Sequence, residues 1–498
     1  MPVKKLKTAL LYTLCFALCV SSCVTLEENP ISGNKRAFAY SWQKEIEIGR
    51  DADKGIIAEY GIYDDAELAK YVEQLGQELL DVSHIKRESA TQEVRETEFT
   101  FRVLDSPVVN AFALPGGYVY VTRGLLGHLE NEAQLAVVLG HEIGHVAGRH
   151  ASQRALNQQL GQIGVLAATI GGQSLGFDGA GILQGSSQAA QLLFLSYSRG
   201  DERESDRVGV EYSALIGYQA SEGGKFFTSL KRISEKSGFN IPSHLSSHPD
   251  PGEREKNIPR MAAEWEQQGY EQTKKNKDEY YNYIADIMYG DNPRNGYVEN
   301  GTFFHPDLKF QFRVPSTFGV VNQPSQVVLF NEEQTAVTLF SIDSENNSPE
   351  TSVNAFLTQE GVTEIDKEAI KANGYDGYQG RATIQNNDQN LSILLTAVAF
   401  EGNIYRFLSY APTDQFSSFR DTFNTIPTSF KEVEDPKVLN IKPVRLRLTT
   451  VEKASVFSDL LPENLPLGIE PLDVAILNQV ELSDTIEAGR VIKIPAQY

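Results

Sequence analysis

Apolar residues recur at helical spacing in two parts of the N-terminal half of the chain. Between Glu45 and Leu80 they fall on three- and four-residue steps, which predicts amphipathic helix packed against a core. A second run, Asn131 to Leu139, is helix-forming and largely apolar, which predicts a rigid, buried helix that continues into the residues after it. The positions that form the first stripe are Leu68, Tyr71, Val72, Leu75 and Leu79.

Extended segments lie between these two helical regions. Phe99 to Leu104 alternates like a strand, and two further extended runs flank the turn Pro115-Gly116-Gly117, which predicts a hairpin directly before the buried helix. The edge of such a hairpin could bind an extended peptide through main-chain hydrogen bonds. A purely structural hairpin fits the pattern equally well.

The pattern changes after about Asn295, where short alternating runs mix with two helical segments, as expected of an α+β accessory domain. A charged linker is expected from Lys431 to Lys437, followed by a tail of strand, helix, helix and strand. The expected strands are 308–314, 336–342, 391–400, 404–408, 444–449 and 491–494, and the expected helices are 352–359, 414–425, 454–461 and 471–478.

The first residues have the pattern of a targeting segment. A basic start precedes the apolar run Thr8 to Val20, whose length of about thirteen residues suits a signal peptide better than a membrane span. Val20-Ser21-Ser22-Cys23 resembles a bacterial lipobox, so we expect cleavage after residue 22 and lipidation of Cys23. An ordinary signal peptide is the alternative. The other two cysteines lie before residue 22, so Cys23 would have no intramolecular disulfide partner.

The length of the chain indicates how many domains to expect, and its net charge excludes some classes of partner. A chain of 498 residues should hold two or three domains. The net charge of −21 argues against nucleic acid as a partner and against electrostatic binding to anionic lipid headgroups. Residues 161–185 are rich in Gly and Ala with almost no charge, and are expected to form a helical hairpin or a lid.

Candidate chemistry follows the buried helical run. His141-Glu142-Ile143-Gly144-His145 contains the pattern His-Glu-x-x-His, which on a helix places both histidines on one face, one turn apart. Two imidazoles so placed can bind one Zn²⁺, and Glu142 can act as general base on a water at the open position. The sequence therefore predicts a zinc peptidase.

The third zinc ligand is expected downstream. His150 would project away from His141 if the helix continued, so it is not expected to be a ligand. Glu202 is the better candidate, because a carboxylate completes a His₂Glu set and leaves one position open. Asp206 shares its helix face and would accept the remaining N–H of a ligand histidine. Read alone, this helix would be a surface helix with salt bridges from Arg199, Arg203 and Arg207.

Four motifs occur in a characteristic order: Asn110 to Gly117, the His-Glu-x-x-His helix, Glu202-x-x-x-Asp206, and Ser247-His248-Pro249 with Arg254. Together they resemble the CAAX prenyl protease family of gluzincins, peptidase family M48, in its bacterial periplasmic BepA-like and LoiP-like branch. The resemblance covers about residues 45–260. It implies zinc ligands His141, His145 and Glu202, the base Glu142, and a regulatory fourth ligand, His248. It also implies substrate pairing along Asn110, Ala111, Phe112 and Ala113.

The tail is similar to a LysM module, which implies a βααβ fold and makes peptidoglycan a candidate partner. The expected fold is multidomain, with a mainly α zincin-type peptidase domain and a small β-sheet. The expected function is a lipid-anchored periplasmic zinc endopeptidase for unfolded or misassembled envelope proteins. The alternative is a chaperone-like binding factor of outer-membrane assembly. The expected segments are 1–22 signal peptide, 23–44 tether, 45–295 peptidase, 300–430 accessory domain and 440–498 LysM-like domain.

Overall fold

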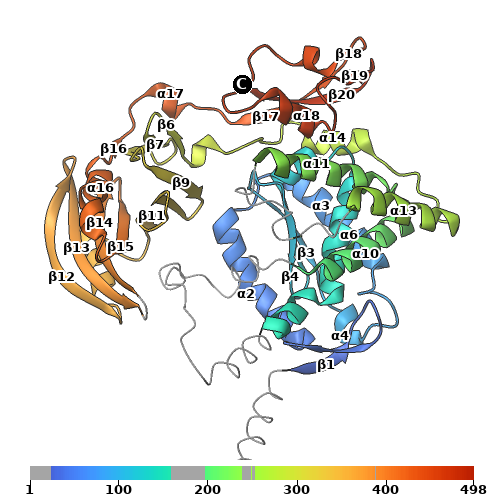
Figure 1. Cartoon of the computed structure of the whole chain (residues 1–498), viewed down its shortest axis with the longest axis horizontal. Coiled ribbons are helices and arrows are strands. Elements are labelled where there is room, and N and C mark those ends of the chain that lie inside the picture. The colour runs from blue at the N-terminus through green and yellow to red at the C-terminus, as the bar shows by residue number, and fades with distance from the viewer. Residues whose placement is uncertain (1–23, 159–196, 238–247, 249–252, 387–388) are drawn as a thin grey trace, which may run out of the picture.

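The computed structural model describes residues 24–158, 197–237, 248, 253–386 and 389–498. The expected signal peptide, Cys23 and the expected lid or hairpin at 161–185 lie outside the described residues, as do residues 238–247 and 249–252 on either side of His248. Figure 1 shows a helical lobe, a β-rich lobe beside it, and a small C-terminal module against the helical lobe. No helix in the described part of the chain is long and apolar enough to cross a bilayer.

The helical lobe is built from amphipathic helices around a buried central helix (Figure 1). The predicted stripe at Leu68 to Leu79 is buried on one helix, but a break at Gly61 divides the 45–80 region into two. The N-caps Ser41, Asp65 and Asn131 each accept a backbone hydrogen bond in the first turn. The helices are α2 (Trp42–Tyr60), α3 (Ala66–Val82), α4 (Gln92–Arg95), α5 (Arg123–His128), α6 (Glu132–Gly148), α10 (Arg199–Leu215), α11 (Glu222–Ser237), α13 (Arg254–Gln267) and α14 (Lys277–Ile284).

The predicted hairpin before the buried helix is confirmed. Strands β4 (Ala111–Leu114) and β5 (Tyr118–Thr122) pair antiparallel, and β3 (Thr100–Leu104) pairs parallel with β5. The order is β3-β5-β4, so β4 is an edge strand, and α6 packs against it. Gly116 and Gly117 have positive φ, and a Cβ on Gly116 would stand 2.4 Å from the Ile46 Cα atom. The turn therefore fixes β4 close to α2.

The expected polar tether is wrong for the described residues 24–44. Strands β1 (Thr25–Glu28) and β2 (Lys35–Phe38) form an antiparallel hairpin, and α2 already starts at Trp42. Asn29 is fully buried and donates its Nδ2–H to the carbonyl of Gly148, at a distance of 2.9 Å. The hairpin is therefore part of the helical lobe, because its side chains satisfy backbone groups at the end of α6.

The region after the helical lobe, where an α+β accessory domain was expected, is rich in β-sheet and contains more strand than predicted. Two long strands, β12 (Val362–Ala372) and β13 (Tyr375–Asn386), were not predicted. The expected linker at Lys431 to Lys437 instead contains strand β16 (Lys431–Glu432) and the start of the short helix α17 (Pro436–Leu439). Helices α15 and α16 belong to different hydrophobic clusters. The seven-stranded sheet has the order β12 (Val362–Ala372), β13 (Tyr375–Asn386), β14 (Gln389–Phe400), β15 (Asn403–Pro412), β11 (Val337–Asp343), β10 (Gln326–Asn331) and β9 (Phe318–Gln323). The remaining elements are a second sheet, β16 (Lys431–Glu432), β8 (Phe310–Arg313), β7 (Thr302–His305) and β6 (Tyr297–Glu299), with helices η2 (Pro293–Asn295), α15 (Pro349–Leu357), α16 (Phe416–Thr428) and α17 (Pro436–Leu439).

The C-terminal module differs from the expected βααβ pattern. Strands β17 (Val444–Thr450) and β20 (Val491–Gln497) and helix α18 (Pro471–Leu477) lie where they were expected. The expected helix at 454–461 is wrong. That segment forms strand β18 (Ser455–Val456), which pairs with β19 (Thr485–Ile486), followed by the 3₁₀ turn η3 (Phe457–Leu460).

The module is docked onto the helical lobe. Leu446 and Leu477 belong to the main hydrophobic core of that lobe. Lys493 is fully buried and donates to the carbonyls of Gly127 (2.9 Å) and Leu129 (2.8 Å), while its Nζ lies 3.1 Å from Glu130. Burial lowers the pKa of Lys493 to about 8, which leaves it mostly protonated at neutral pH. The bonded residues lie directly before α6.

We predict that Lys493→Met destabilises the helical lobe by roughly 3–5 kcal/mol, because it leaves Glu130 and two carbonyls buried without their cation. Urea unfolding followed by tryptophan fluorescence would measure this, since Trp42 and Trp265 lie in that lobe. The matched control is Lys236→Met, whose half-buried ion pairs with Glu470 and Asp473 join the same two parts and should contribute less than about 1 kcal/mol. Equal midpoints for the two variants would contradict the prediction.

Candidate metal centre

Helix α6 supplies the two histidines of the predicted motif. Every residue of the helix is buried, so the histidines stand on a fixed support. The side chain of Asn131 caps the first turn by accepting from the Gln134 N–H. The helix ends at Gly148, because Arg149 adopts the left-handed conformation with φ 57° and ψ 37°.

Helix α10 packs across α6 at unusually short range. A Cβ placed on Gly140 would lie 3.0 Å from the Cα of Gly209, and one placed on Gly209 would lie 2.8 Å from the His141 nitrogen. Any larger side chain at either position would push the helices apart. The capping box between Ser198 and Asp201 starts α10 directly before Glu202. These features bring Glu202 under the two histidines.

Four side chains converge on one point. The Nε2 atoms of His141 and His145 lie 2.9 Å apart, and each lies 3.4 Å from a carboxylate oxygen of Glu202. His248 reaches the same point, with its Nδ1 atom 3.1 Å from Glu202 and 3.3 Å from His141 Nε2. One candidate ligand atom from each of the four residues lies within 4.8 Å of the others, and all four side chains are buried.

This donor set fits Zn²⁺. Two imidazole nitrogens and a carboxylate oxygen are the ligands of a catalytic His₂Glu zinc site, which keeps a further position for water or substrate. His141, His145 and Glu202 would hold the ion. His248 lies where that further position is expected.

The electrostatics of the two glutamates differ. Burial raises the pKa of Glu142 above its ordinary value, which favours proton uptake. Its Oε1 atom lies 3.7 Å from Nε2 of His248. Burial would also raise the pKa of Glu202, but the charge of His248 and hydrogen bonds from His141 and His145 hold it well below its ordinary value. Glu202 is therefore suited to remain an anion, and Glu142 to exchange a proton.

Asp206 and Arg254 support the ligands from behind. Asp206 Oδ1 lies 2.9 Å from Nδ1 of His141, so His141 can donate to it while directing Nε2 into the site. Arg254, which is 2% exposed, donates to Asp206 and lies 3.4 Å from Glu202. Its guanidinium stacks on Phe227 at 3.7 Å. Arg254 thus holds two carboxylates of α10 together.

The predicted substrate strand lies beside this centre. Ala111, Phe112 and Ala113 are in β4, which in the described part of the chain pairs only with β5, and Asn110 precedes it. Ala113 and His145 line the same small cavity. The free edge of β4 is therefore at the zinc helix.

Some side chains at the site were missed or misread from the sequence. The helical spacing of Glu204 directs it to a different face from Glu202 and Asp206, and its Oε2 atom lies 3.1 Å from Nε2 of His150. His150 would project away from His141 if the helix continued, but the helix ends at Gly148, and Nδ1 of His150 lies 3.0 Å from Nδ1 of His145. His150 is outside the converging group, as expected. Tyr197, which no local signal marked, stacks on the His145 ring at 3.9 Å.

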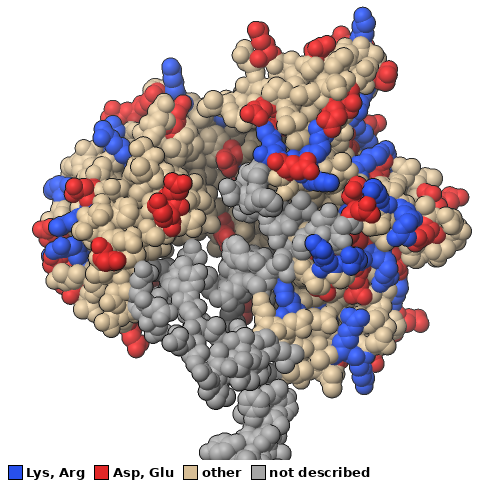
Figure 2. All heavy atoms as spheres, in the orientation of Figure 1, with Lys and Arg blue, Asp and Glu red and all other residues tan. Residues whose placement is uncertain are grey.

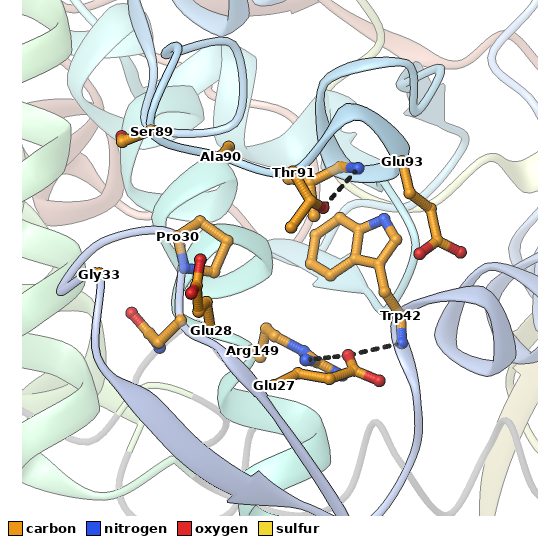
Figure 3. Close-up of a pocket in the computed structure, with 12 residues that line it drawn as sticks. Glu27, Glu28, Pro30, Gly33, Trp42, Ser89, Ala90, Thr91, Glu93 and Arg149 are labelled. Atoms are coloured by element: carbon orange, nitrogen blue, oxygen red, sulfur yellow. Dashed lines mark hydrogen bonds and ion pairs between the residues drawn. The ribbon is translucent and has the colours of Figure 1, made fainter.

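A separate cavity of about 320 Å³ lies between the N-terminal hairpin, the start of α2 and the turn before α4. Figure 3 shows Trp42 and Arg149 on its wall, with Glu27 joined to Arg149. Arg149 is the residue that ends α6, so the wall of this cavity is shared with the end of the zinc helix.

The site combines a buried His₂Glu centre on two crossing helices with a glutamate directly after the first histidine. An edge strand lies alongside. This combination is that of the gluzincin class of metallopeptidases. Residues 67–262 match the model of Peptidase family M48.

Relatives of two kinds share this region. The beta-barrel assembly-enhancing protease of Yersinia pestis is 28% identical over 234 residues, which cover 45% of each chain. The putative beta-barrel assembly-enhancing protease of Vibrio cholerae is 32% identical over 204 residues, covering 39% of each. The mitochondrial metalloendopeptidase OMA1 of Bos taurus is 32% identical over 173 residues, covering 34% of this chain and 33% of its own. The chain thus spans less than half the length of these relatives.

Proposed function

We propose that the protein is a zinc metalloendopeptidase that cleaves unfolded or misassembled envelope proteins. The observation that carries this is the convergence of His141, His145 and Glu202, with Glu142 beside them. Peptidase family M48 and the protease names of the relatives support the same activity.

The chain's own residues would hold the ion, transfer the proton and exclude bulk water. Bound zinc would supply Lewis acidity to the scissile carbonyl and the attacking water. Glu142 would take the proton from that water and deliver it to the leaving amine. The buried surroundings of Glu142 exclude bulk water, which makes its proton transfer more effective.

Substrate selection would follow from the edge of β4. Asn110, Ala111, Phe112 and Ala113 can pair with an extended peptide through main-chain groups, which recognises an extended backbone more than a sequence. Unfolded proteins offer such segments and folded ones do not. The names of the bacterial relatives refer to β-barrel assembly, which supports envelope proteins as the substrate class.

We predict that Glu142→Gln lowers cleavage of an unfolded test protein such as reduced casein by roughly 10²–10⁴-fold, because the amide cannot accept the proton. Zinc content measured by atomic absorption should stay unchanged. Glu93→Gln, an exposed position on α4, is the matched control and should cleave like the native chain. If Glu142→Gln retained zinc and full cleavage, the proposed mechanism would be wrong.

His248 supports a latent form of this enzyme. Its imidazole lies against Glu202, His141 and Glu142, so it would compete with water and substrate for the open zinc position. The resting enzyme would then be slow for as long as His248 occupies that position.

We expect His248→Ala to raise the initial rate of casein cleavage several-fold, because it removes this competitor. His305→Ala, in the β-rich lobe, is the control for removal of a histidine elsewhere. A rate equal to or below that of the native chain would count against latency.

The location would be the periplasm, with the chain anchored to the outer membrane through lipidated Cys23. The basic start, the apolar run and the lipobox-like Val20 to Cys23 support this, and so do the bacterial relatives. On the face that Figure 2 shows, acidic and basic side chains of the described residues are intermixed over both lobes, so these residues offer no extended basic surface for binding anionic lipid, and a covalent lipid would have to supply the anchor.

For this anchor, a Cys23→Ala precursor should leave the membrane pellet and appear in the soluble periplasmic fraction, because it has no site for the acyl chains. Fractionation with immunoblotting measures it. Unchanged membrane partitioning of the processed chain would contradict lipid anchoring.

A chaperone-like factor of outer-membrane assembly is the second candidate. The observation that favours it is His248 in the closed site, since a latent protease could hold clients without cutting them. Glu142→Gln separates the two functions, because a holding function would survive that change. Peptidoglycan binding by the C-terminal module stays a prediction.

A further inference from the structure

His150 and Glu204 form a hydrogen-bonded chain behind the zinc ligand His145. His145 has two ring nitrogens, of which Nε2 faces Glu202 and His141. Its Nδ1 atom lies 3.0 Å from Nδ1 of His150, and the Nε2 atom of His150 lies 3.1 Å from Glu204. The imidazole of His150 is 1% exposed, and Glu204 is mostly buried.

The proton positions in this chain follow from the role of His145. A neutral histidine that binds metal through Nε2 carries its proton on Nδ1. His145 therefore donates to Nδ1 of His150, which must be an acceptor. The proton of His150 then resides on Nε2 and is donated to the Glu204 carboxylate. Glu204 is thus placed to fix the tautomer of both rings.

The backbone is shaped to bring His150 to this place. Arg149 adopts the left-handed conformation, which costs roughly 1–2 kcal/mol for a residue with a side chain. The buried guanidinium of Arg149 maintains it through bonds to Glu45 (2.9 Å), Glu27 (2.7 Å) and the Tyr40 carbonyl (2.7 Å). The turn redirects the chain so that His150 lies beside His145, on the side away from the other ligands.

Gly148 leaves the space that the His150 ring occupies. A Cβ at position 148 would lie 2.3 Å from Nε2 of His150 and 2.7 Å from its Cε1. The ring therefore packs directly over the backbone of the last residue of α6. Tyr197 stacks on the face of the His145 ring, with the ring centroids 3.9 Å apart. His145 is constrained at its face by Tyr197 and at its edge by His150.

We infer that His150 is a positioning residue for the zinc ligand His145, with Glu204 holding its tautomer. The arrangement on His141, whose Nδ1 atom faces Asp206 at 2.9 Å, is the direct counterpart. Helix α10 would thus provide three acidic groups with separate tasks: Glu202 as ligand, Asp206 behind His141, and Glu204 behind His145 through His150. The inference rests on the proposed zinc site.

The test measures zinc affinity of the full mature chain by competition with a chromophoric chelator. His150→Phe, which keeps a ring and removes the acceptor, should weaken zinc binding by roughly 10–100-fold. His150→Gln, whose amide oxygen can accept the same bond, should recover most of the loss. Gly148→Ala, which displaces the ring without removing it, should also weaken binding. His84→Phe is the matched control, because His84 is a buried histidine that bonds Tyr212 of the same helix α10.

A spectroscopic measurement separates positioning from general destabilisation. In the Co²⁺-substituted chain, the visible absorption bands report ligand geometry, and they should change in His150→Phe and not in His84→Phe. Glu204→Gln provides a second route, since the Glu204 side chain keeps 22% of its surface exposed and the isosteric amide should not prevent folding. This variant should lower zinc affinity by roughly tenfold or less.

The outcomes distinguish this inference from the proposed function. A native chain that binds no zinc would refute both. A native chain that binds zinc and cleaves casein, with His150→Phe and Glu204→Gln matching it in zinc affinity and cobalt spectrum, would refute only the positioning role. Loss of affinity in His150→Phe with recovery in His150→Gln supports it.

Discussion

The close contact of α6 with α10 is the constraint on which the metal centre depends. Gly140 and Gly209 meet where any side chain would collide with backbone, and Gly144 faces Val208 and Ser205 in the same way. Helix axes normally pack 8–10 Å apart with side chains between them. Each interior glycine costs roughly 1 kcal/mol of helix propensity. The shorter separation offsets that cost, because it lets Glu202 reach both histidines from a different part of the chain.

Helix α6 is held at both of its ends by parts of the chain that are far away in sequence. The N-terminal hairpin bonds its last turn through Asn29 and Glu27, and the C-terminal module reaches its start, where Gln479 bonds Gln134. Figure 1 shows these two elements on opposite sides of the helical lobe. Catalytic geometry must be kept to within a fraction of an ångström, so such bracing is a functional requirement. The segment expected to be a tether and the C-terminal module are both parts of the scaffold that supports α6.

The parts of the site that could be predicted from the sequence are those whose residues lie within a few positions of one another, so that local geometry alone places them. His141, Glu142 and His145 lie on one helical turn, and the Pro115-Gly116-Gly117 turn defines its hairpin without help from the rest of the fold. His150 could not be predicted, because its position depends on the left-handed conformation of Arg149, which tertiary ion pairs maintain.

In the accessory and C-terminal regions, too, the elements that depend on contacts between distant parts of the chain could not be predicted from the sequence. The exposed, charged residues of β12 gave no alternation of apolar and polar positions, and only pairing with β13 makes the segment a strand. Ala454 to Leu461 was predicted as helix, but Ser455 and Val456 pair with β19, which is distant in sequence. Long-range pairing decided the structure in both cases.

The charge balance at the centre explains why one ion can be expected to hold these elements together. Glu142, Glu202 and Asp206 are almost fully buried, and the guanidinium of Arg254 contacts Glu202 and Asp206. Neutral histidines, which metal binding requires, add no charge. The buried carboxylates thus carry two negative charges in excess, and an uncompensated buried charge is strongly unfavourable. A divalent cation cancels that excess. Zinc binding and the stability of the α6–α10 contact should therefore be coupled, and the glycines that bring the helices together also determine how tightly the ion is held.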